Sequence, residues 1–324
     1  MRKIALLTSG GDAPGMNTAI RSIVRTAIYQ GLETVGALKG YQGLVNADFI
    51  PLQLRSVSNI INRGGTILKT ARCAEFFEKE GRKRANEHLK KNKIDALIVI
   101  GGNGSFCGAH LLALEHNFPV IGVPGTIDND IAGTDFSIGS DTAVNTALEA
   151  IDKIRDTVSS MERIFVVEVM GRKEGYIALR VGLAGGAEDV LIPQTEYDIE
   201  RMCEDISKGR KRGKVSWIIV VSEGVAGSKD VASLIEELTG FETRSITLGH
   251  IQRGGSPTAI DRILASRLGA EAVKALLAGE RDKMVGMTGE TIKLIDFSSA
   301  CAQGREKRNK LDKEIYGLIR VLAT

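Results

Sequence analysis

ALIVIGGNGS, residues 96–105, is the stretch of this 324-residue chain that decides its fold. Its first five residues are apolar and rich in Ile and Val, as in a strand that is buried on both faces. The glycines that follow end the strand and form a turn from which a helix can start. A strand, a glycine turn and a helix in this order indicate an α/β protein with a parallel sheet.

The same pattern recurs along the chain, which strengthens this interpretation. Further apolar runs of strand length are Ile4 to Leu7, Val120 to Val123, Ile164 to Val169 and Trp217 to Val221. Helical periodicity follows from Asn17 onward, from Thr142 to Ile154 and from Ser233 to Leu238. We therefore expect parallel sheets with helices on both faces, and ligand sites at the carboxyl ends of the strands.

Composition excludes several classes of protein. The 43 Lys and Arg residues nearly balance 40 Asp and Glu, which argues against a globally basic nucleic-acid binder. Four widely spaced cysteines without a CxxC pair are typical of a reducing compartment. No apolar run has the roughly 18 residues of a membrane span, and the N-terminal run is too short for a signal peptide. We expect a cytoplasmic protein of two domains, with no nucleic-acid or membrane partner.

Three loops that follow predicted strands carry residues suited to phosphate chemistry. Residues 8–17, TSGGDAPGMN, combine glycines with a helix N-terminus, although a tight turn alone would also explain them. Residues 101–108, GGNGSFCG, repeat that arrangement after the next predicted strand. Residues 124–130, PGTIDND, place Asp128 and Asp130 on a short loop, where one could accept a proton and the other organise a metal. A solvated turn is the alternative for this third loop.

Arginines beside glycines are the fourth signal, because a guanidinium matches the geometry of a phosphate and stays charged. Any one of them could equally be a surface residue. His250, within GHIQRGG, is either a structural histidine or a substrate contact. The five arginines are Arg72, Arg163, Arg172, Arg244 and Arg253.

Taken together, these segments resemble the bacterial ATP-dependent 6-phosphofructokinases. The resemblance runs from Met1 to about Gly279, and its order and spacing match the family throughout. The motifs that carry it are LTSGGDAPGMN, INRGGT with TAR, VIGGNGS, PGTIDNDI, VVEVMGR, GLAGGAE, GFETR, LGHIQRGGSPTA and DRILASRLGA. PGTIDND and GHIQRGGSP are the most specific of these motifs.

The resemblance implies two Rossmann-like three-layer α/β domains with mainly parallel sheets and the active site in the cleft between them. A larger ATP-binding domain would comprise residues 1–138 and 256–304. A smaller domain for fructose 6-phosphate would comprise residues 139–255 and 305–324, and the tail from Arg305 is expected to be a docked helix. The family works as a homotetramer and catalyses the committed step of glycolysis under allosteric control.

Residue by residue, the resemblance implies a site with Asp128 as the general base for the C1 hydroxyl of the sugar. Thr126, Arg72 and Arg172 would complete the catalytic set, with Mg²⁺ held at Asn103 and Asp130. The residues implied for ATP are Gly11, Tyr41, Arg72, Cys73, Gly102, Asn103, Gly104, Ser105 and Gly108. Those implied for fructose 6-phosphate are Thr126, Asp128, Arg163, Met170, Gly171, Arg172, Glu223, Arg244, His250 and Arg253, with Arg163 and Arg244 reaching into a neighbouring subunit.

Two glycines bear on the phosphoryl donor. Pyrophosphate-using relatives typically have Asp at the position of Gly104 and Lys at that of Gly125. A carboxylate at the first position would repel the α-phosphate of ATP, so glycine at both positions favours ATP over the pyrophosphate alternative.

Asn103 departs from the family, whose motif has aspartate at this position. Asn103 keeps an oxygen but loses the negative charge that Mg²⁺ prefers. We therefore expect this site to bind Mg²⁺ more weakly than in the family. The alternative is that the chain is a weak or inactive paralogue that binds sugar phosphate and nucleotide as a regulatory subunit.

A second site is implied for allosteric ADP or phosphoenolpyruvate. Arg21 and Arg25 lie four residues apart and share a helix face, which on its own would be a solvated basic face. Asn59 and Ser216 stand where the family commonly has aspartate and histidine. The residues implied for the effector are Arg21, Arg25, Asn59, Arg155, Gly186, Glu188, Arg212 and Lys214.

Overall fold

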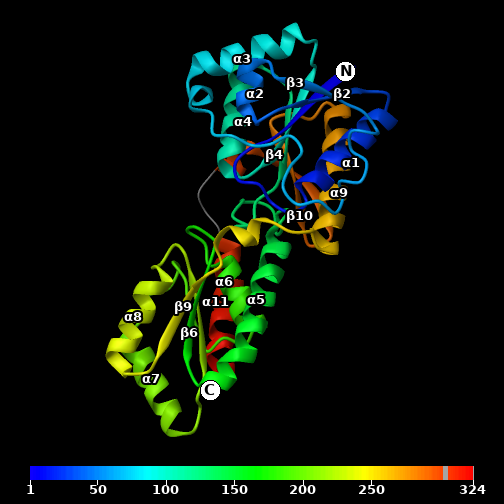
Figure 1. Ribbon diagram of the computed structural model, residues 1–324. Coiled ribbons are helices and arrows are strands. Elements are labelled where there is room, and N and C mark those ends of the chain that lie inside the picture. The colour runs from blue at the N-terminus through cyan, green and yellow to red at the C-terminus, as the bar shows by residue number, and fades with distance from the viewer. Residues whose placement is uncertain (302–305, 324) are drawn as a thin grey trace. The chain divides into compact units, whose positions relative to one another are not determined.

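The computed structural model of the chain describes residues 1–301 and 306–323 (Figure 1). The chain divides into two compact units. The first unit consists of Met1–Thr142 and the segment that begins at Arg253. The second consists of Ala143–Gln252 and the C-terminal helix. The chain end Thr324 and the domain limit expected at 304/305 lie outside the described residues.

The first unit is built on a seven-stranded sheet in the order β11-β10-β5-β4-β1-β2-β3. Its five central strands are parallel, and β3 and β11 pair antiparallel at the two edges. Every residue of β4, ALIVIG, is buried. The strands are β1 (Lys3–Thr8), β2 (Glu33–Ala37), β3 (Phe49–Leu52), β4 (Ala96–Gly101), β5 (Val120–Pro124), β10 (Lys283–Thr288) and β11 (Thr291–Asp296).

Helices cover both faces of this sheet. The helices α1 (Met16–Tyr29) and α9 (Ala259–Leu277) pack against each other on one face. The other face carries α2 (Tyr41–Asn46), α3 (Lys79–Lys91), α4 (Asn103–His116) and α10 (Phe297–Cys301), which lie opposite α1 and α9 in Figure 1. The short helix η1 (Ala74–Phe77) precedes α3. This unit is therefore a three-layer α/β sandwich.

The second unit has a four-stranded, all-parallel sheet in the order β7-β8-β6-β9. Its strands are β6 (Ile164–Val169), β7 (Asp189–Leu191), β8 (Trp217–Ser222) and β9 (Thr243–Thr247). One face carries α7 (Ile199–Lys211) and α8 (Ser228–Thr239). The other carries α5 (Ser140–Met161), α6 (Tyr176–Ala184) and α11 (Glu306–Leu322), and η2 (Gly249–Arg253) follows β9 (Figure 1).

The predicted α/β fold is confirmed. All five predicted strands are present, and the three periodic segments are the helices α1, α5 and α8. The C-terminal helix also packs as expected, because Arg180 of α6 pairs with Asp312 of α11 at 3.4 Å. Among the described residues, no helix combines the length and apolar character needed to cross a membrane.

Candidate active site

Three loops converge at one edge of the first unit's sheet. They follow β1, β4 and β5, which are neighbours in the sheet, so the carboxyl ends of these strands lie side by side. The backbone N–H of Ser9 donates to the carbonyl of Ile100 at 2.9 Å, and that of Gly125 donates to Gly101 at 2.9 Å. The structure therefore brings together the three segments that were singled out from the sequence as candidates for phosphate chemistry.

Arg253 lies against the first of these loops. Its guanidinium Nη1 donates to the carbonyl of Asp12 at 3.2 Å. A Cβ added at Gly11 would meet the same guanidinium, so a larger residue there would displace the end of the Arg253 side chain. Arg253, expected to bind the sugar phosphate, thus contacts the loop expected to bind ATP.

An aromatic pair flanks the second loop. The rings of Tyr41 and Phe76 stack with centroids 3.9 Å apart, and the Tyr41 hydroxyl donates to the carbonyl of Ser105. A Cβ on Gly108 would come within 3.2 Å of Phe76, so a larger residue would crowd the stack. Tyr41, Ser105 and Gly108, all expected at the nucleotide, are therefore grouped in one place. Cys73 is buried beside this cluster, and Arg72 is exposed.

An ion pair between a buried arginine and a glutamate that is not buried holds the segment that carries Phe76. Arg82 of α3 contacts Glu115 of α4 at 2.7 Å and donates from Nη1 to the carbonyls of Phe76 and Phe77. Hydrogen bonding to Glu115 raises the pKa of Arg82, and the same contact lowers the pKa of Glu115. Sequence analysis missed this pair, because the partners are 33 residues apart.

The acidic loop after β5 has one buried and one partly exposed carboxylate. Asp128 is only 2% exposed, whereas Asp130 is partly exposed. The backbone N–H of Asp128 donates to the Thr126 hydroxyl at 3.3 Å, so these two residues are held together as expected. A buried carboxylate at a strand end suits the acceptance of a proton from a bound hydroxyl.

Asn103 and Asp130 are in direct contact. The Asn103 amide Nδ2 donates to the carbonyl of Asp130 at 3.0 Å and to its carboxylate Oδ2 at 3.1 Å. The other amide atom, Oδ1 of Asn103, is buried without a hydrogen-bond partner in the structure. A buried orphaned oxygen next to a carboxylate fits the hard oxygen ligands of Mg²⁺.

The loop after β6 supplies a set of backbone and side-chain groups in the second unit. The carboxylate Oε1 of Glu223 accepts from the backbone N–H groups of Gly171 at 3.1 Å and Arg172 at 2.8 Å. Arg172 has φ 52°, a left-handed conformation that non-glycine residues adopt rarely and at a cost of about 1–3 kcal/mol. Met170 is buried at this loop, and its neighbour Arg172 is exposed. Of the expected sugar-phosphate residues, Met170, Gly171, Arg172 and Glu223 are therefore brought together.

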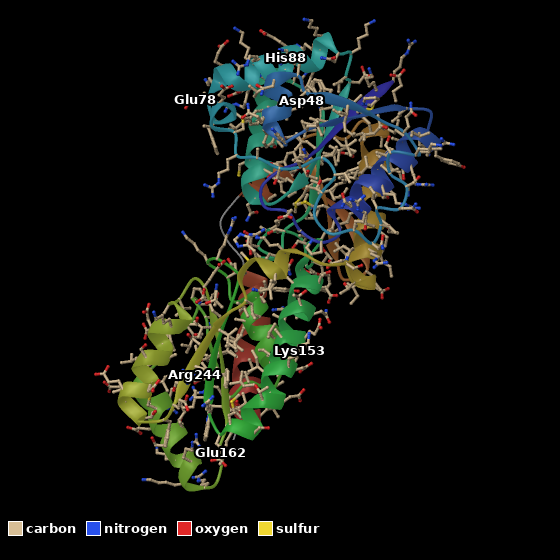
Figure 2. The ribbon with its side chains drawn as sticks, in the orientation of Figure 1. Asp48, Glu78, His88, Lys153, Glu162 and Arg244 are labelled. Atoms are coloured by element: carbon tan, nitrogen blue, oxygen red, sulfur yellow. The ribbon has the colours of Figure 1, made fainter. Side chains whose placement is uncertain are left out.

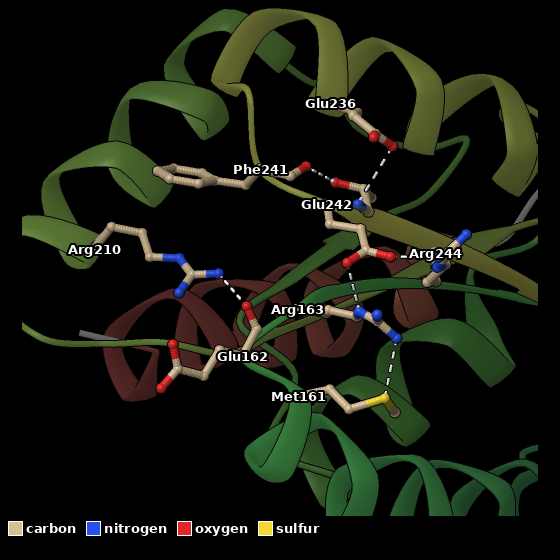
Figure 3. Close-up of polar contacts among 9 residues, drawn as sticks. Met161, Glu162, Arg163, Arg210, Glu236, Phe241, Glu242 and Arg244 are labelled. Carbon is tan, nitrogen blue, oxygen red and sulfur yellow. Dashed lines mark hydrogen bonds and ion pairs between the residues drawn. The ribbon is translucent and has the colours of Figure 1, made fainter.

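Arg163 and Arg244, two further predicted arginines, both contact the carboxylate of Glu242 (Figure 3). Nε of Arg163 lies 2.7 Å from Oε2 of Glu242, and the other oxygen of Glu242 pairs with Arg244. Arg163 also donates to the Met161 sulfur at 3.0 Å. Arg163 directly precedes β6 and Arg244 lies in β9, and the parallel pairing of these two strands brings the arginines to the same end of the sheet. Glu242 was not singled out from the sequence, although it belongs to the GFETR motif.

Arg210 supports the same corner of the second unit. It donates to the backbone carbonyl of Glu162, and its guanidinium lies 4.8 Å from the Phe241 ring centroid (Figure 3). Glu162 and Phe241 directly precede Arg163 and Glu242, so Arg210 fixes both sides of that ion pair. His250, the remaining candidate in this unit, is exposed on η2.

The residues implied for the effector fall in both units. Arg21, Arg25 and Asn59 belong to the first unit, and Arg25 is exposed on α1.

In the second unit Arg155 donates to the carbonyls of Gly185 and Gly186 at 2.6 Å. Lys214 lies 3.5 Å from Glu188 and donates to the carbonyl of Ala323 at 3.0 Å. Arg212 is exposed at the end of α7. Figure 2 labels Lys153, Glu162 and Arg244 among the side chains of the second unit.

Asp261 holds the backbone at the start of α5, after the acidic loop. The sequence analysis did not single out this residue. Its carboxylate accepts from the backbone N–H groups of Gly139 and Thr142 at 2.8 Å, and it is 1% exposed. Burial raises the pKa of Asp261, and these hydrogen bonds oppose that shift. The start of α5, which follows the acidic loop, is held to α9 by this residue.

The comparisons with known proteins agree with this arrangement. The family model described as phosphofructokinase matches residues 3–276. The chain belongs to the phosphofructokinase family. It is 52% identical, over the full length of both chains, to the ATP-dependent 6-phosphofructokinase of Halothermothrix orenii. It is 51% identical to that of Thermotoga neapolitana, again over 100% of each chain. Among solved structures, phosphofructokinase from Saccharomyces cerevisiae matches with a TM-score of 0.87 at 34% identity; the match covers 100% of this chain and 47% of the yeast chain.

Proposed function

We propose that this chain transfers the γ-phosphoryl group of MgATP to the C1 hydroxyl of fructose 6-phosphate. The products are fructose 1,6-bisphosphate and ADP. The observation that carries this proposal is the convergence of the two glycine loops and the acidic loop, with buried Asp128, at one sheet edge. Full-length relatives at about half identity, named ATP-dependent 6-phosphofructokinase, support the same activity.

In this proposal Asp128 accepts the proton of the C1 hydroxyl, and Thr126 holds the Asp128 backbone in place. Arg72 and Arg172 stabilise the negative charge on the transferred group, since phosphoryl transfer depends mostly on positioning and charge. Asp130 and the Oδ1 atom of Asn103 would hold Mg²⁺. When bound, that ion neutralises charge on the ATP phosphates.

The surroundings of Gly104 and Gly125 agree with ATP as the phosphoryl donor. Gly104 has no atom within 4 Å of an added Cβ, so the loop leaves room beside it. Gly125 is enclosed, because an added Cβ would lie 3.2 Å from Ile100 and 3.3 Å from Met16. The lysine typical of pyrophosphate-using relatives would crowd these side chains. Both environments agree with a nucleotide donor.

One group of the residues assigned to the sugar phosphate belongs to the second unit. Met170, Gly171, Arg172 and Glu223 lie together at the loop after β6, and His250 follows β9. Arg163 and Arg244 would reach the substrate of a neighbouring subunit in a homotetramer. Exposed apolar side chains at Ile260 and Ile263, three residues apart on α9, support such an assembly, because exposed apolar surface often marks interfaces.

Allosteric control by ADP or phosphoenolpyruvate is part of the proposal. It is supported by the cations that survive at the implied effector positions and by the short contacts of Arg155 and Lys214. A cytoplasmic location follows from the proposed glycolytic role.

The test is a coupled assay with fructose 6-phosphate, run once with MgATP and once with pyrophosphate. Formation of fructose 1,6-bisphosphate with MgATP, and none with pyrophosphate, is the expected result. Activity with pyrophosphate alone would overturn the donor. If neither donor reacts, although calorimetry shows that both substrates bind, the chain is a binding paralogue.

A further inference from the structure

The acidic loop turns back on itself, so that its returning segment, residues 135–138, lies beside its beginning. Gly125 and Ile138 form a parallel β-bridge. The backbone N–H of Thr126 donates to the carbonyl of Ile138 at 3.1 Å, and that of Ile138 donates to the carbonyl of Pro124 at 3.0 Å. The returning segment is therefore bonded to the part of the chain that leads to the proposed general base.

One buried hydroxyl joins the two arms of this turn. The Oγ atom of Ser137 lies 2.7 Å from the carbonyl oxygen of Thr126 and 3.0 Å from Oδ1 of Asn129. The Nδ2 atom of Asn129 donates in turn to the carbonyl of Asp135 at 3.0 Å. Asn129 directly follows Asp128, and Thr126 accepts the backbone N–H of Asp128 through its own hydroxyl. The contacts of Ser137 therefore hold the backbone on both sides of the proposed base.

Asn129 itself has an uncommon backbone conformation. Its φ is 45°, in the left-handed region that residues other than glycine rarely adopt and that asparagine tolerates better than most. Its buried side chain contacts the returning segment, whereas the next residue, Asp130, contacts Asn103. The loop thus places a residue with internal hydrogen bonds between its two acids.

We propose that Ser137 and Asn129 are positioning residues that hold the Asp128 carboxylate in the geometry needed for proton transfer. This inference rests on the proposed function, in which Asp128 is the general base. A general base must lie within hydrogen-bond distance of the hydroxyl whose proton it accepts. A displacement of about 1 Å in such a site can cost roughly 100-fold in rate. Ser137 and Asn129 are outside the set expected to touch ATP or the sugar, so their loss should lower kcat and leave both KM values unchanged.

Three variants separate the side-chain contacts from the backbone conformation. Ser137→Ala removes the hydroxyl, and Asn129→Ala removes both amide contacts and disfavours the left-handed φ. Asn129→Gly removes the same contacts and adopts this φ without steric cost. If the contacts position Asp128, all three variants should lose roughly 10- to 100-fold in kcat with unchanged KM for both substrates. A normal kcat in Asn129→Gly would show that only the backbone conformation matters, and it would overturn the proposal.

Thr34→Val is the matched control for the loss of a buried hydroxyl. The Thr34 hydroxyl donates to the carbonyl of Leu52 at 2.7 Å, and this contact joins β2 to β3. In the sheet, β1 and β4 separate β2 from β5, which leads into the acidic loop. Thr34→Val should therefore lower the melting temperature about as much as Ser137→Ala and leave kcat unchanged. An equal loss of kcat in this control would reduce the effect of Ser137→Ala to general destabilisation.

Amide hydrogen exchange, measured by mass spectrometry on the full chain, tests the contacts without turnover. Peptides that cover residues 124–130 should exchange faster in Ser137→Ala and Asn129→Gly than in the parent, whereas peptides of β2 should not. If Ser137→Ala does not fold, the two Asn129 variants decide on the same terms. Unchanged exchange at residues 124–130 would show that these contacts do not hold the loop.

The two measurements together separate this inference from the proposed function. Faster exchange with unchanged kcat, in a parent that is active with MgATP, would refute the positioning role. A parent without MgATP activity would refute the proposed function and with it the role in catalysis. The exchange result would still decide whether Ser137 and Asn129 hold the acidic loop.

Discussion

The candidate residues of the two units are held in place by different kinds of contact. In the first unit they lie mostly on glycine loops, where backbone atoms approach each other and Arg253 rests against Gly11. In the second unit they are charged side chains whose positions depend on other charges, as Arg163 and Arg244 depend on Glu242. Backbone cradles suit phosphates that must lie close to the chain, whereas arginines suit a phosphate at the end of a flexible sugar.

The largest effect is expected at Asp128, the proposed general base of the first unit. Asp128→Asn keeps the size of the side chain and removes the base, so kcat should fall by roughly 10²- to 10⁴-fold. KM for ATP should change little, since the glycine loops are intact. Steady-state kinetics with both substrates checks this. A variant with near-normal kcat would remove Asp128 from the mechanism.

The next effect concerns the second unit. Arg163→Ser should raise KM for fructose 6-phosphate by roughly 10- to 100-fold, because it deletes a charge-assisted hydrogen bond worth about 1.5–3 kcal/mol. If Arg163 serves a neighbouring subunit, hybrids of Arg163→Ser and Asp128→Asn chains should regain activity that neither homotetramer has. Hybrids that assemble and stay inactive would argue against sharing. Lys153→Ala, on the exposed face of α5, is a control that should leave KM unchanged.

Asn103→Asp tests how the first unit handles its metal. The aspartate would place a second carboxylate where Asn103 now donates to Asp130, and two carboxylates there favour a divalent cation. We expect the Mg²⁺ concentration for half-maximal rate to fall by roughly threefold to tenfold, with fructose 6-phosphate affinity unchanged. Unchanged Mg²⁺ dependence and kcat would show that residue 103 does not govern the metal.

The smallest effect is expected at Glu242, which contacts Arg163 and Arg244 and is proposed only to position them. Glu242→Gln keeps one hydrogen bond to Arg163 and loses the ion pair, which contributes little between exposed groups. KM for fructose 6-phosphate should therefore rise two- to fivefold, with kcat unchanged. An equal rise in KM for ATP would indicate a general structural change and not a local one.

Among the described residues, the sequence predicted three of the first unit's seven strands and two of the second unit's four. Buried Val- and Ile-rich runs such as Ala96 to Ile100 are local signals, and so are the glycines behind them. β9, with the sequence TRSIT, is largely exposed and has no apolar run, so it was not predicted. The antiparallel edge strands β3 and β11 were missed for a similar reason, since each has exposed positions.

The contacts within the candidate site could not be read from the sequence either. Arg253 and Asp12 are 241 residues apart, and Arg163 and Glu242 are 79 apart. Such pairs depend on strand order, which local patterns do not specify. The resemblance to the phosphofructokinases identified most of these residues individually. The anchors Glu242, Arg82 and Asp261 emerged only from the contacts.

The division of ligands between the two units is tested most directly at Gly104. An added Cβ there meets no atom within 4 Å, so Gly104→Asp changes charge without a steric clash. A carboxylate about 4 Å from an ATP phosphate costs roughly 1–4 kcal/mol. Calorimetric titration should show MgATP affinity at least about fivefold weaker and fructose 6-phosphate affinity unchanged. Unchanged MgATP affinity, or equal loss for both ligands, would contradict the assignment of the nucleotide to this loop.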